Sequence, residues 1–279
     1  MARAIAPTFT RKLGQPVVIE NRIGAGGTIG AQSVAQARAD GYTLLIGGIN
    51  TLVTAALQRP DLQYAPATDF VPLGGLIRVP YAIAVAARIP VHSVAELAAY
   101  ARAHPGEISF ASGGTGSTSQ LAIELLKSRL ELNMLHVPYR GIIAALPDFI
   151  GGRVDLLATD LAILLPLQKA GSIRIIATGG AQRASMAPDI PTVAEQGVPG
   201  YEIQPWYGLY APSGTPREIA EMLSDSLSEA LRSDQVRKVL VDQGYELMPL
   251  SPASLRELSI TETRKYADLL DKTGLRNSR

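Results

Sequence analysis

The residues best suited to bind a ligand lie in a loop rich in glycine and hydroxyl side chains, within Ile108–Leu121. An apolar strand pattern precedes the loop and a helical pattern follows it. Unpaired backbone N–H groups and the positive end of a helix dipole should therefore meet at the carboxyl end of the strand. Glycines let an anion approach the backbone, and hydroxyl groups add donors; the loop contains Gly113, Gly114, Thr115, Gly116, Ser117 and Thr118. This pattern indicates a site for an anion such as a carboxylate, with an ordinary capped strand-to-helix turn as the alternative.

Three further residues stand where a ligand could contact the protein. Asp160 follows the apolar run Val154–Ala158, where it either orients a ligand hydroxyl or amine or caps the next helix. Trp206 and Tyr207 follow a proline-rich connection, where aromatic rings either wall a ligand or pack the crossing between two domains. For all three residues the structural role is the commoner one.

The remaining motifs give little support to an enzyme. The chain has no cysteine and three histidines, His92, His104 and His136, without metal-ligand spacing. No Gly-x-Ser-x-Gly elbow occurs, and the glycine cluster Arg22–Gly30 fits neither the dinucleotide fingerprint nor the P-loop. A paired-carboxylate mechanism and a hydrolase using Ser117 or Thr118 stay open. The sequence favours a protein that is not an enzyme and carries no metal or organic cofactor.

Length and composition indicate two globular domains. The chain has 279 residues, of which 47% are hydrophobic and 18% charged. Lys and Arg number 26 against 25 for Asp and Glu, so there is no net field to attract nucleic acid. No apolar run approaches the roughly 20 residues of a membrane span, and we expect no signal peptide, because the N-terminal stretch lacks an uninterrupted apolar core.

Short apolar runs alternate with amphipathic helical ones, which is typical of an α/β fold. Capping patterns predict helices after Ser93, after Thr215 with Pro216, and after Ser251 with Pro252. The predicted strands are Val17–Glu20, Thr43–Gly47, Tyr81–Ala86, Ile108–Ala111, Leu135–Val137, Val154–Ala158 and Ile173–Ala177.

Seven phrases along the chain resemble the receptors of tripartite tricarboxylate transporters, the Bug or TctC-like solute-binding proteins. These phrases are Leu13–Arg22, Gly24–Gly27, Asp40–Leu45, Ser112–Ser117, His136–Gly141, Pro191–Glu195 and Trp206–Leu209. Each phrase is weak alone, but seven in register over nearly the whole chain make a specific match.

The resemblance implies a two-lobed α/β periplasmic-binding-protein fold of the Venus-flytrap, type II-like kind. Lobe one would comprise residues 1–92 and 207–279, and lobe two residues 93–206. Such a receptor binds a small carboxylate and delivers it to a membrane permease. The carboxylate would be a di- or tricarboxylate, an acidic amino acid or an aromatic carboxylate. We expect a periplasmic monomer that binds no nucleic acid.

The resemblance also implies which residues bind the ligand. In lobe two they would be Thr115, Gly116, Ser117 and Thr118, with Tyr139 and Asp160 nearby. In lobe one Asn50 and Thr51 would close the other side, and Trp206 and Tyr207 match the hinge phrase.

The chain departs from the family pattern at three places. The family begins with a strand and a Gly-Gly loop that we expect to be missing here, ahead of the helix that contains Met1. Gln120 stands where the family has histidine, and Ile142 stands where a small or hydroxyl residue is usual. An alternative function is therefore a truncated remnant of such a receptor that no longer binds a ligand.

Overall fold

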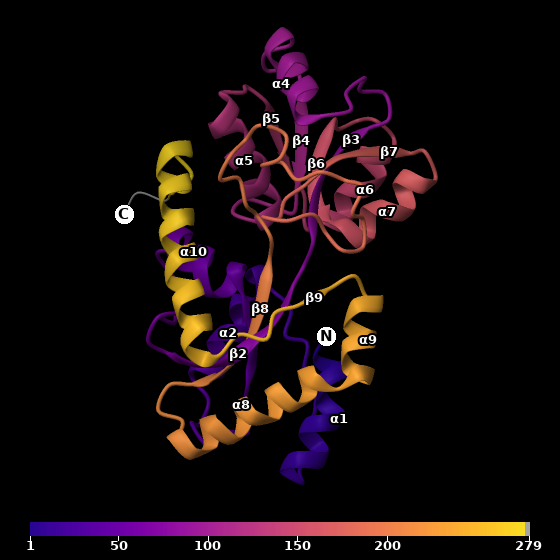
Figure 1. The fold of residues 1–279 in the computed structure, drawn as a ribbon. Helices are drawn as coiled ribbons and strands as arrows, with labels where there is room; N and C mark the ends of the chain where they lie inside the picture. Colours follow the sequence, from indigo (N-terminus) through magenta and orange to yellow (C-terminus); the bar gives the residue numbers. More distant parts are fainter. Residues whose placement is uncertain (277–279) are drawn as a thin grey trace. The chain divides into compact units, whose positions relative to one another are not determined.

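The computed structural model describes residues 1–276 and divides into two compact units. Unit 1 comprises Met1–Arg78 and Trp206–Arg279, of which residues 277–279 lie outside the described part, and unit 2 comprises Val79–Pro205 (Figure 1). The predicted division after residue 92 differs from this boundary. Residues 79–92 belong to unit 2 because β3 (Tyr81–Ala86) pairs with two strands of that unit.

Unit 2 is built on a five-stranded sheet of order β5-β4-β6-β3-β7. Strands β5, β4 and β6 run parallel, and β3 pairs antiparallel with both β6 and β7. Their bounds are β4 Ser109–Ser112, β5 Leu135–Pro138, β6 Leu156–Asp160 and β7 Ile173–Thr178. Strands that are covered on both faces need apolar residues along their whole length, which accounts for the apolar runs in the sequence. Phe110, Leu157 and Ile83 are buried examples.

Four helices accompany this sheet: α4 Val94–Ala103, α5 Thr118–Leu130, α6 Ile142–Ile150 and α7 Leu161–Lys169. Helix α5 packs on β4 and β6, and α7 packs on β3, β6 and β7. Parallel strands need such crossover helices, so the alternation seen in the sequence follows from the parallel part of the sheet.

Unit 1 contains an antiparallel sheet of order β1-β8-β2-β9, in which β1 is an end strand. Its strands are β1 Leu45–Gly48, β2 Phe70–Arg78, β8 Trp206–Pro212 and β9 Glu246–Leu247. Helices α8 (Arg217–Arg232) and α10 (Pro252–Thr273) both pack against β2. The predicted tail of helices after residue 210 is thus confirmed, and it covers the sheet of unit 1.

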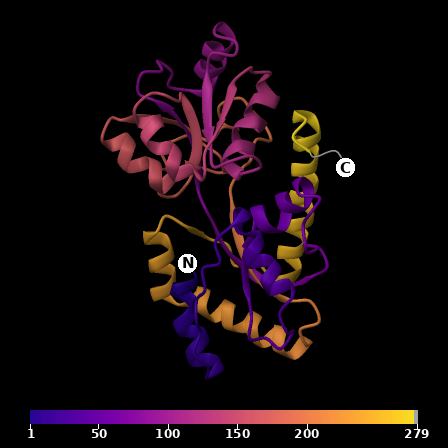
Figure 2. The same cartoon turned by 180° about the vertical axis from the view of Figure 1, so that it is seen from behind.

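Shorter helical segments complete unit 1. Helix α1 (Ala2–Leu13) lies beside α8 in both Figure 1 and Figure 2, and it also contacts α9. The remaining segments are η1 Ala25–Gly27, α2 Thr28–Ala35, the π-helical turn η2 Asn50–Thr54, α3 Ala55–Gln58 and α9 Asp234–Asp242.

Two local predictions were wrong. Residues 17–20, predicted as a strand, form no strand and pair with no strand of the described chain. Thr215 does not cap α8, because its hydroxyl donates to the Pro212 carbonyl and the helix begins after Pro216. Strands β2 and β8 were not predicted.

The caps at Ser93 and Ser251 are confirmed. The Ser93 hydroxyl accepts from the backbone N–H of Glu96, and the Glu96 carboxylate accepts from the N–H of His92, one residue before the cap. Ser251 accepts from the N–H of Ser254, with Pro252 in the first turn of α10.

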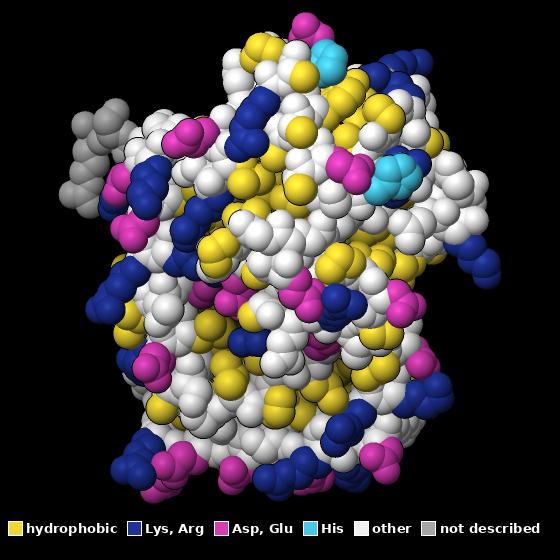
Figure 3. Space-filling view, turned by 45° about the horizontal axis from the view of Figure 1, so that its top comes forward, with side chains coloured by type: hydrophobic (Ala, Val, Ile, Leu, Met, Phe, Trp, Pro, Cys, Tyr) yellow, Lys and Arg dark blue, Asp and Glu magenta, His cyan; other side chains and the backbone are white. Residues whose placement is uncertain are grey.

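On the face in Figure 3, basic and acidic side chains are interspersed, in keeping with a formal net charge of +1. Within residues 1–276, no helix combines the length and the apolar character that crossing a bilayer requires.

The Ser93 cap gives a test of the fold. Ser93→Ala should lower the free energy of unfolding of unit 2 by about 1 kcal/mol, because the Glu96 N–H loses its acceptor. Urea unfolding measures this loss. The matched control is Ser233→Ala, because Ser233 occupies the N-cap of α9 without a side-chain cap hydrogen bond. Equal losses in the two variants would contradict the assignment.

Candidate binding site

The glycine loop connects the end of β4 at Ser112 to the start of α5 at Thr118. Its conformation is fixed by its own hydrogen bonds. The Gly113 N–H donates to Ser119 Oγ over 2.8 Å, and the Ser117 hydroxyl donates to the Gly114 carbonyl over 2.6 Å. Gly114 and Gly116 have φ of 117° and 78°, which an L side chain rarely adopts. The loop is therefore preformed, and glycine is needed at both positions.

A chain of side chains supports the loop from the sheet. Ser112 Oγ lies 2.6 Å from His136 Nε2 and accepts from the N–H of Gly114. Gln120 Nε2 lies 3.4 Å from His136 Nδ1, and Gln120 Oε1 accepts from the Gly116 N–H over 2.7 Å. One imidazole thus links both ends of the loop. No sequence pattern predicts this link, because Gln120 and His136 meet only through the folded geometry.

The protonation state of His136 follows from these contacts. Burial lowers its pKa, the nearby Glu124 carboxylate raises it, and Lys127 lowers it further. The ring also stacks on Phe110, with 4.9 Å between centroids. A neutral imidazole that accepts from Gln120 and donates to Ser112 fits both hydrogen bonds.

Backbone donors remain for a ligand. In the part of the chain that the structure describes, the N–H groups of Thr115 and Ser119 donate to no protein acceptor. Thr115 is exposed and Ser119 is 2% exposed, and the 13-residue helix α5 adds the positive end of its dipole at this point. The loop can therefore bind an anion without a lysine or arginine of its own.

Parallel strands bring two further predicted residues to the same sheet edge. Tyr139 follows β5, and its N–H donates to the Ser112 carbonyl over 3.0 Å. Asp160 ends β6, which runs parallel to β4. Six predicted residues therefore come from one edge of the unit 2 sheet: Thr115, Gly116, Ser117, Thr118, Tyr139 and Asp160.

Asp160 and Tyr139 differ in what they can offer a ligand. Asp160 precedes α7 without a side-chain cap bond, and burial raises the pKa of its half-buried carboxyl group. The Tyr139 hydroxyl already donates to the Asp148 carboxylate over 2.8 Å, and burial raises its pKa. Asp160 is therefore the freer group for contact with a ligand.

The other four predicted residues lie in unit 1. Asn50 and Thr51 open the turn after β1, where the Thr51 hydroxyl exchanges hydrogen bonds with the backbone of Gly48. Trp206 and Tyr207 begin β8; Trp206 is 2% exposed, and its indole nitrogen has no partner among the described residues. Trp206 is thus a core residue of unit 1, as the structural interpretation of the sequence favours.

Comparison with known proteins identifies the family. The family model "Tripartite tricarboxylate transporter family receptor" matches residues 1–275. The chain belongs to this receptor family. The resemblance of the seven sequence phrases is thereby confirmed, and so is the periplasmic-binding-protein fold.

Solved structures agree with this assignment. Rpa4515 of R. palustris, solved with adipate, is 38% identical with a TM-score of 0.87, and the match covers 98% of this chain and 91% of Rpa4515. MatC (Rpa3494) from Rhodopseudomonas palustris, solved with bound malate, is 34% identical with a TM-score of 0.83, and the match covers 96% of this chain and 92% of MatC. The periplasmic binding protein BugD is 32% identical with a TM-score of 0.84, and the match covers 99% of this chain and 93% of BugD.

The family consists of solute-binding receptors and is not an enzyme family, which confirms the non-enzymatic interpretation. The geometry agrees with it at Ser117, whose hydroxyl contacts the Gly114 carbonyl and Ser119 Oγ, neither of which is a general base. No group of three or more acidic, histidine or cysteine side chains within residues 1–276 could hold a metal ion.

We expect His136 to make the free energy of unfolding depend on pH. Because burial lowers its pKa, the folded chain binds fewer protons than the unfolded chain below about pH 6.5, the ordinary histidine value. This contribution to the free energy of unfolding is fully present above that pH and declines as the pH falls through the lowered pKa of His136 in the folded chain. His136→Gln should flatten the decline measured by urea unfolding between pH 7 and pH 5.

His92→Gln is the control for this experiment, because His92 is exposed on the same unit. It should retain the pH dependence of the parent chain. If His136→Gln also retains it fully, His136 does not carry the effect.

Proposed function

We propose that this receptor binds a linear dicarboxylate in the periplasm and delivers it to a membrane permease. The observation that carries the proposal is the preformed glycine loop between β4 and α5, in which the N–H groups of Thr115 and Ser119 donate to no acceptor of the described chain. One carboxylate of the ligand would bind there. The family assignment supports the role, and its tripartite transporters would supply the permease.

The donor set suits a carboxylate. Thr115 and Ser119 offer backbone N–H groups, and hydrogen bonds to a charged acceptor contribute about 1.5–3 kcal/mol each. The helix dipole adds roughly 0.3–1 kcal/mol. Because the loop is held by Ser112, Gln120 and His136 before the ligand arrives, little ordering is needed on binding.

The comparisons support a dicarboxylate over the other candidate carboxylates. Rpa4515 was solved with adipate and MatC with malate, and these two molecules share two carboxylates on a short chain. Asp160 lies at the same sheet edge as the loop. Its carboxyl group, whose pKa burial raises, would accept from or donate to a ligand hydroxyl or a second polar group.

The unit 1 residues form a second predicted set. Asn50 is exposed and Tyr207 half-buried, so both offer polar groups at the surface of their unit. Thr51 and Trp206 are buried, and in our proposal they support these two residues. Asn50→Ala and Tyr207→Phe, measured by calorimetry, test whether unit 1 contributes to affinity.

Ligand binding is tested by thermal melting with adipate, malate, succinate, citrate, glutamate and terephthalate. A ligand bound only by the folded chain stabilises it by about 2.7 kcal/mol at a hundredfold excess over Kd, which moves the midpoint by a few degrees. The proposal predicts shifts with the linear dicarboxylates. A melt that no carboxylate shifts would instead favour a remnant without binding function, and a response to citrate or terephthalate alone would overturn the dicarboxylate assignment.

The loop itself is tested by Gly114→Ala. Its φ of 117° disfavours alanine, and a Cβ atom there would lie 3.3 Å from the Tyr139 carbonyl, so the loop must distort. We expect at least about a tenfold loss of adipate affinity by calorimetry, the loss of one hydrogen bond to a charged group. The control is Gly171→Ala, with φ of 72° and open space, in the turn after α7. Unchanged affinity in Gly114→Ala, or an equal loss in both variants, would contradict the loop assignment.

A further inference from the structure

The hydrogen bonds of Ser112 determine which nitrogen of the His136 ring carries the proton. The Ser112 hydroxyl donates to the Gly114 carbonyl over 3.2 Å and accepts from the Gly114 N–H over 3.1 Å. Its oxygen lies 2.6 Å from His136 Nε2. Because the single hydroxyl proton is already used, Nε2 must be the donor in this contact. The neutral ring then has a bare Nδ1, which needs a donor.

The orientation of the Gln120 carboxamide is determined in the same way. Its Oε1 accepts from the Gly116 N–H over 2.7 Å, and a backbone N–H can only donate. Its Nε2 therefore faces His136 Nδ1, 3.4 Å away, and supplies the donor that the bare nitrogen needs. Gln120 is 1% exposed, so the protein and not bulk water provides its partners. We name this connection from His136 through Gln120 to Gly116 the Gln120 link.

Protonation of His136 is incompatible with this arrangement. The imidazolium carries a proton on both nitrogens, so Nδ1 would face the Gln120 NH₂ group donor to donor. A half-turn of the carboxamide removes the conflict, because Oε1 then accepts from Nδ1. The same half-turn brings the NH₂ group to the Gly116 N–H, which loses its acceptor. The contact with Ser112 does not change, because Nε2 donates in both states.

The charged groups that act on His136 come from α5. Glu124 and Lys127 pair over 3.0 Å, and their effects on the pKa of His136 are opposite. Strand β4 contributes the Phe110 ring, which stacks on the imidazole, and the Ser112 hydroxyl, neither of which titrates near neutral pH. Burial is the largest effect and lowers the pKa of His136 from the ordinary value of 6.5. The ring therefore gains its charge below that pH.

We propose that Gln120 is a positioning residue that transmits the protonation state of His136 to the glycine loop, so that protonation strengthens the binding of a ligand carboxylate. Two effects act in the same direction. The released Gly116 N–H joins those of Thr115 and Ser119 as a donor, and a positive charge appears beside the loop. This inference rests on the proposed function, because it concerns the same loop.

The ligand and the proton then strengthen each other's binding. If protonation tightens binding, a bound carboxylate raises the pKa of His136, and the two affinities change by the same factor. The affinity for the ligand is lowest above the pKa of His136 in the complex. It rises as the pH falls through that value and levels off below the pKa in the free receptor. We expect a factor of about five or more, which is the lower end of the usual coupling between two sites.

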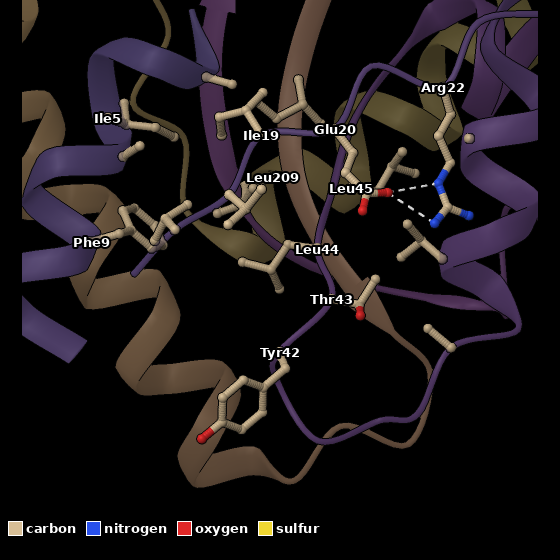
Figure 4. Close-up of a pocket in the computed structure, with 18 of the residues that line it drawn as sticks. Ile5, Phe9, Ile19, Glu20, Arg22, Tyr42, Thr43, Leu44, Leu45 and Leu209 are labelled. Carbon is tan, nitrogen blue, oxygen red and sulfur yellow. Dashed lines mark hydrogen bonds and ion pairs between the residues drawn. The ribbon is translucent and has the colours of Figure 1, made fainter. Parts of the chain in front are cut away.

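The first test needs neither a ligand nor a variant. Isotope-labelled receptor is titrated from about pH 7.5 to about pH 5 while nuclear magnetic resonance follows the His136 imidazole and the backbone amides. The Gly116 amide proton should move upfield with the midpoint of His136, because it exchanges a carboxamide acceptor for water. Unit 1 contains none of the three histidines. The amides of Leu45 and Leu209, beside the unit 1 pocket in Figure 4, should therefore show no step at that midpoint.

The second test measures adipate affinity by calorimetry at the two ends of this pH range. From the upper to the lower pH, the affinity of the parent chain should rise about fivefold or more relative to that of His136→Gln, in which the ligand titrates but residue 136 does not. Saturating adipate should raise the His136 midpoint in the parent chain. The matched control is His92→Gln, because His92 is exposed on the same unit, and it should behave as the parent does.

Gln120→Met separates the Gln120 link from the charge of the ring. Methionine has about the length of glutamine but no carboxamide, so His136 should still titrate while the Gly116 amide no longer follows it. A Gly116 amide that ignores the His136 midpoint in the parent, or that still follows it in Gln120→Met, would overturn the Gln120 link. An equal change of affinity with pH in the parent and in His136→Gln would overturn the coupling to the ligand. Absence of carboxylate binding at either pH would overturn the proposed function, and the first test would still decide the Gln120 link.

Discussion

The glycine loop connects a buried strand to a helix and must leave some of its backbone N–H groups without a protein acceptor. What the receptor can bind depends on which of these N–H groups stay available. Backbone groups near a sheet edge are costly to leave unpaired, so most of the loop is satisfied internally through Ser117, Ser119 and Gln120. Ser112 and His136 anchor it to the sheet. The donors that remain, at Thr115 and Ser119, lie at the start of α5, where an anion is favoured.

Much of the fold could be predicted from local signals, because hydrophobic period and helix caps depend on neighbouring residues. Ser93 and Ser251 are examples. Strands β2 and β8 could not be predicted, because their glycines suggest loops. The reason for those glycines is tertiary: a Cβ atom at Gly75 would lie 2.5 Å from the Met248 carbonyl, and one at Gly208 would lie 2.5 Å from the Leu255 side chain. At residues 17–20 the error is the opposite one: a strand was predicted and none forms. Their apolar pattern is that of a strand, but a strand also needs a pairing partner.

The part of the site that follows from the parallel pairing of β4, β5 and β6 could be predicted from the sequence. Residues at the ends of β4, β5 and β6 meet because parallel strands share a carboxyl edge, so Tyr139 and Asp160 lie at the same edge as the loop. The support through His136 was not predictable, because it joins residues 24 positions apart through side-chain geometry. The ligand roles of Asn50, Thr51, Trp206 and Tyr207 rest on family resemblance and stay predictions.

In the proposed complex, backbone N–H groups of the glycine loop bind a carboxylate of the ligand. The most direct measurement is a titration of isotope-labelled receptor with adipate, followed by nuclear magnetic resonance of the backbone amides. We expect the Thr115 and Ser119 amide protons to move downfield and to saturate with the same dissociation constant as calorimetry gives, because each gains a charged acceptor. Saturable binding that leaves these two amides unchanged would contradict it.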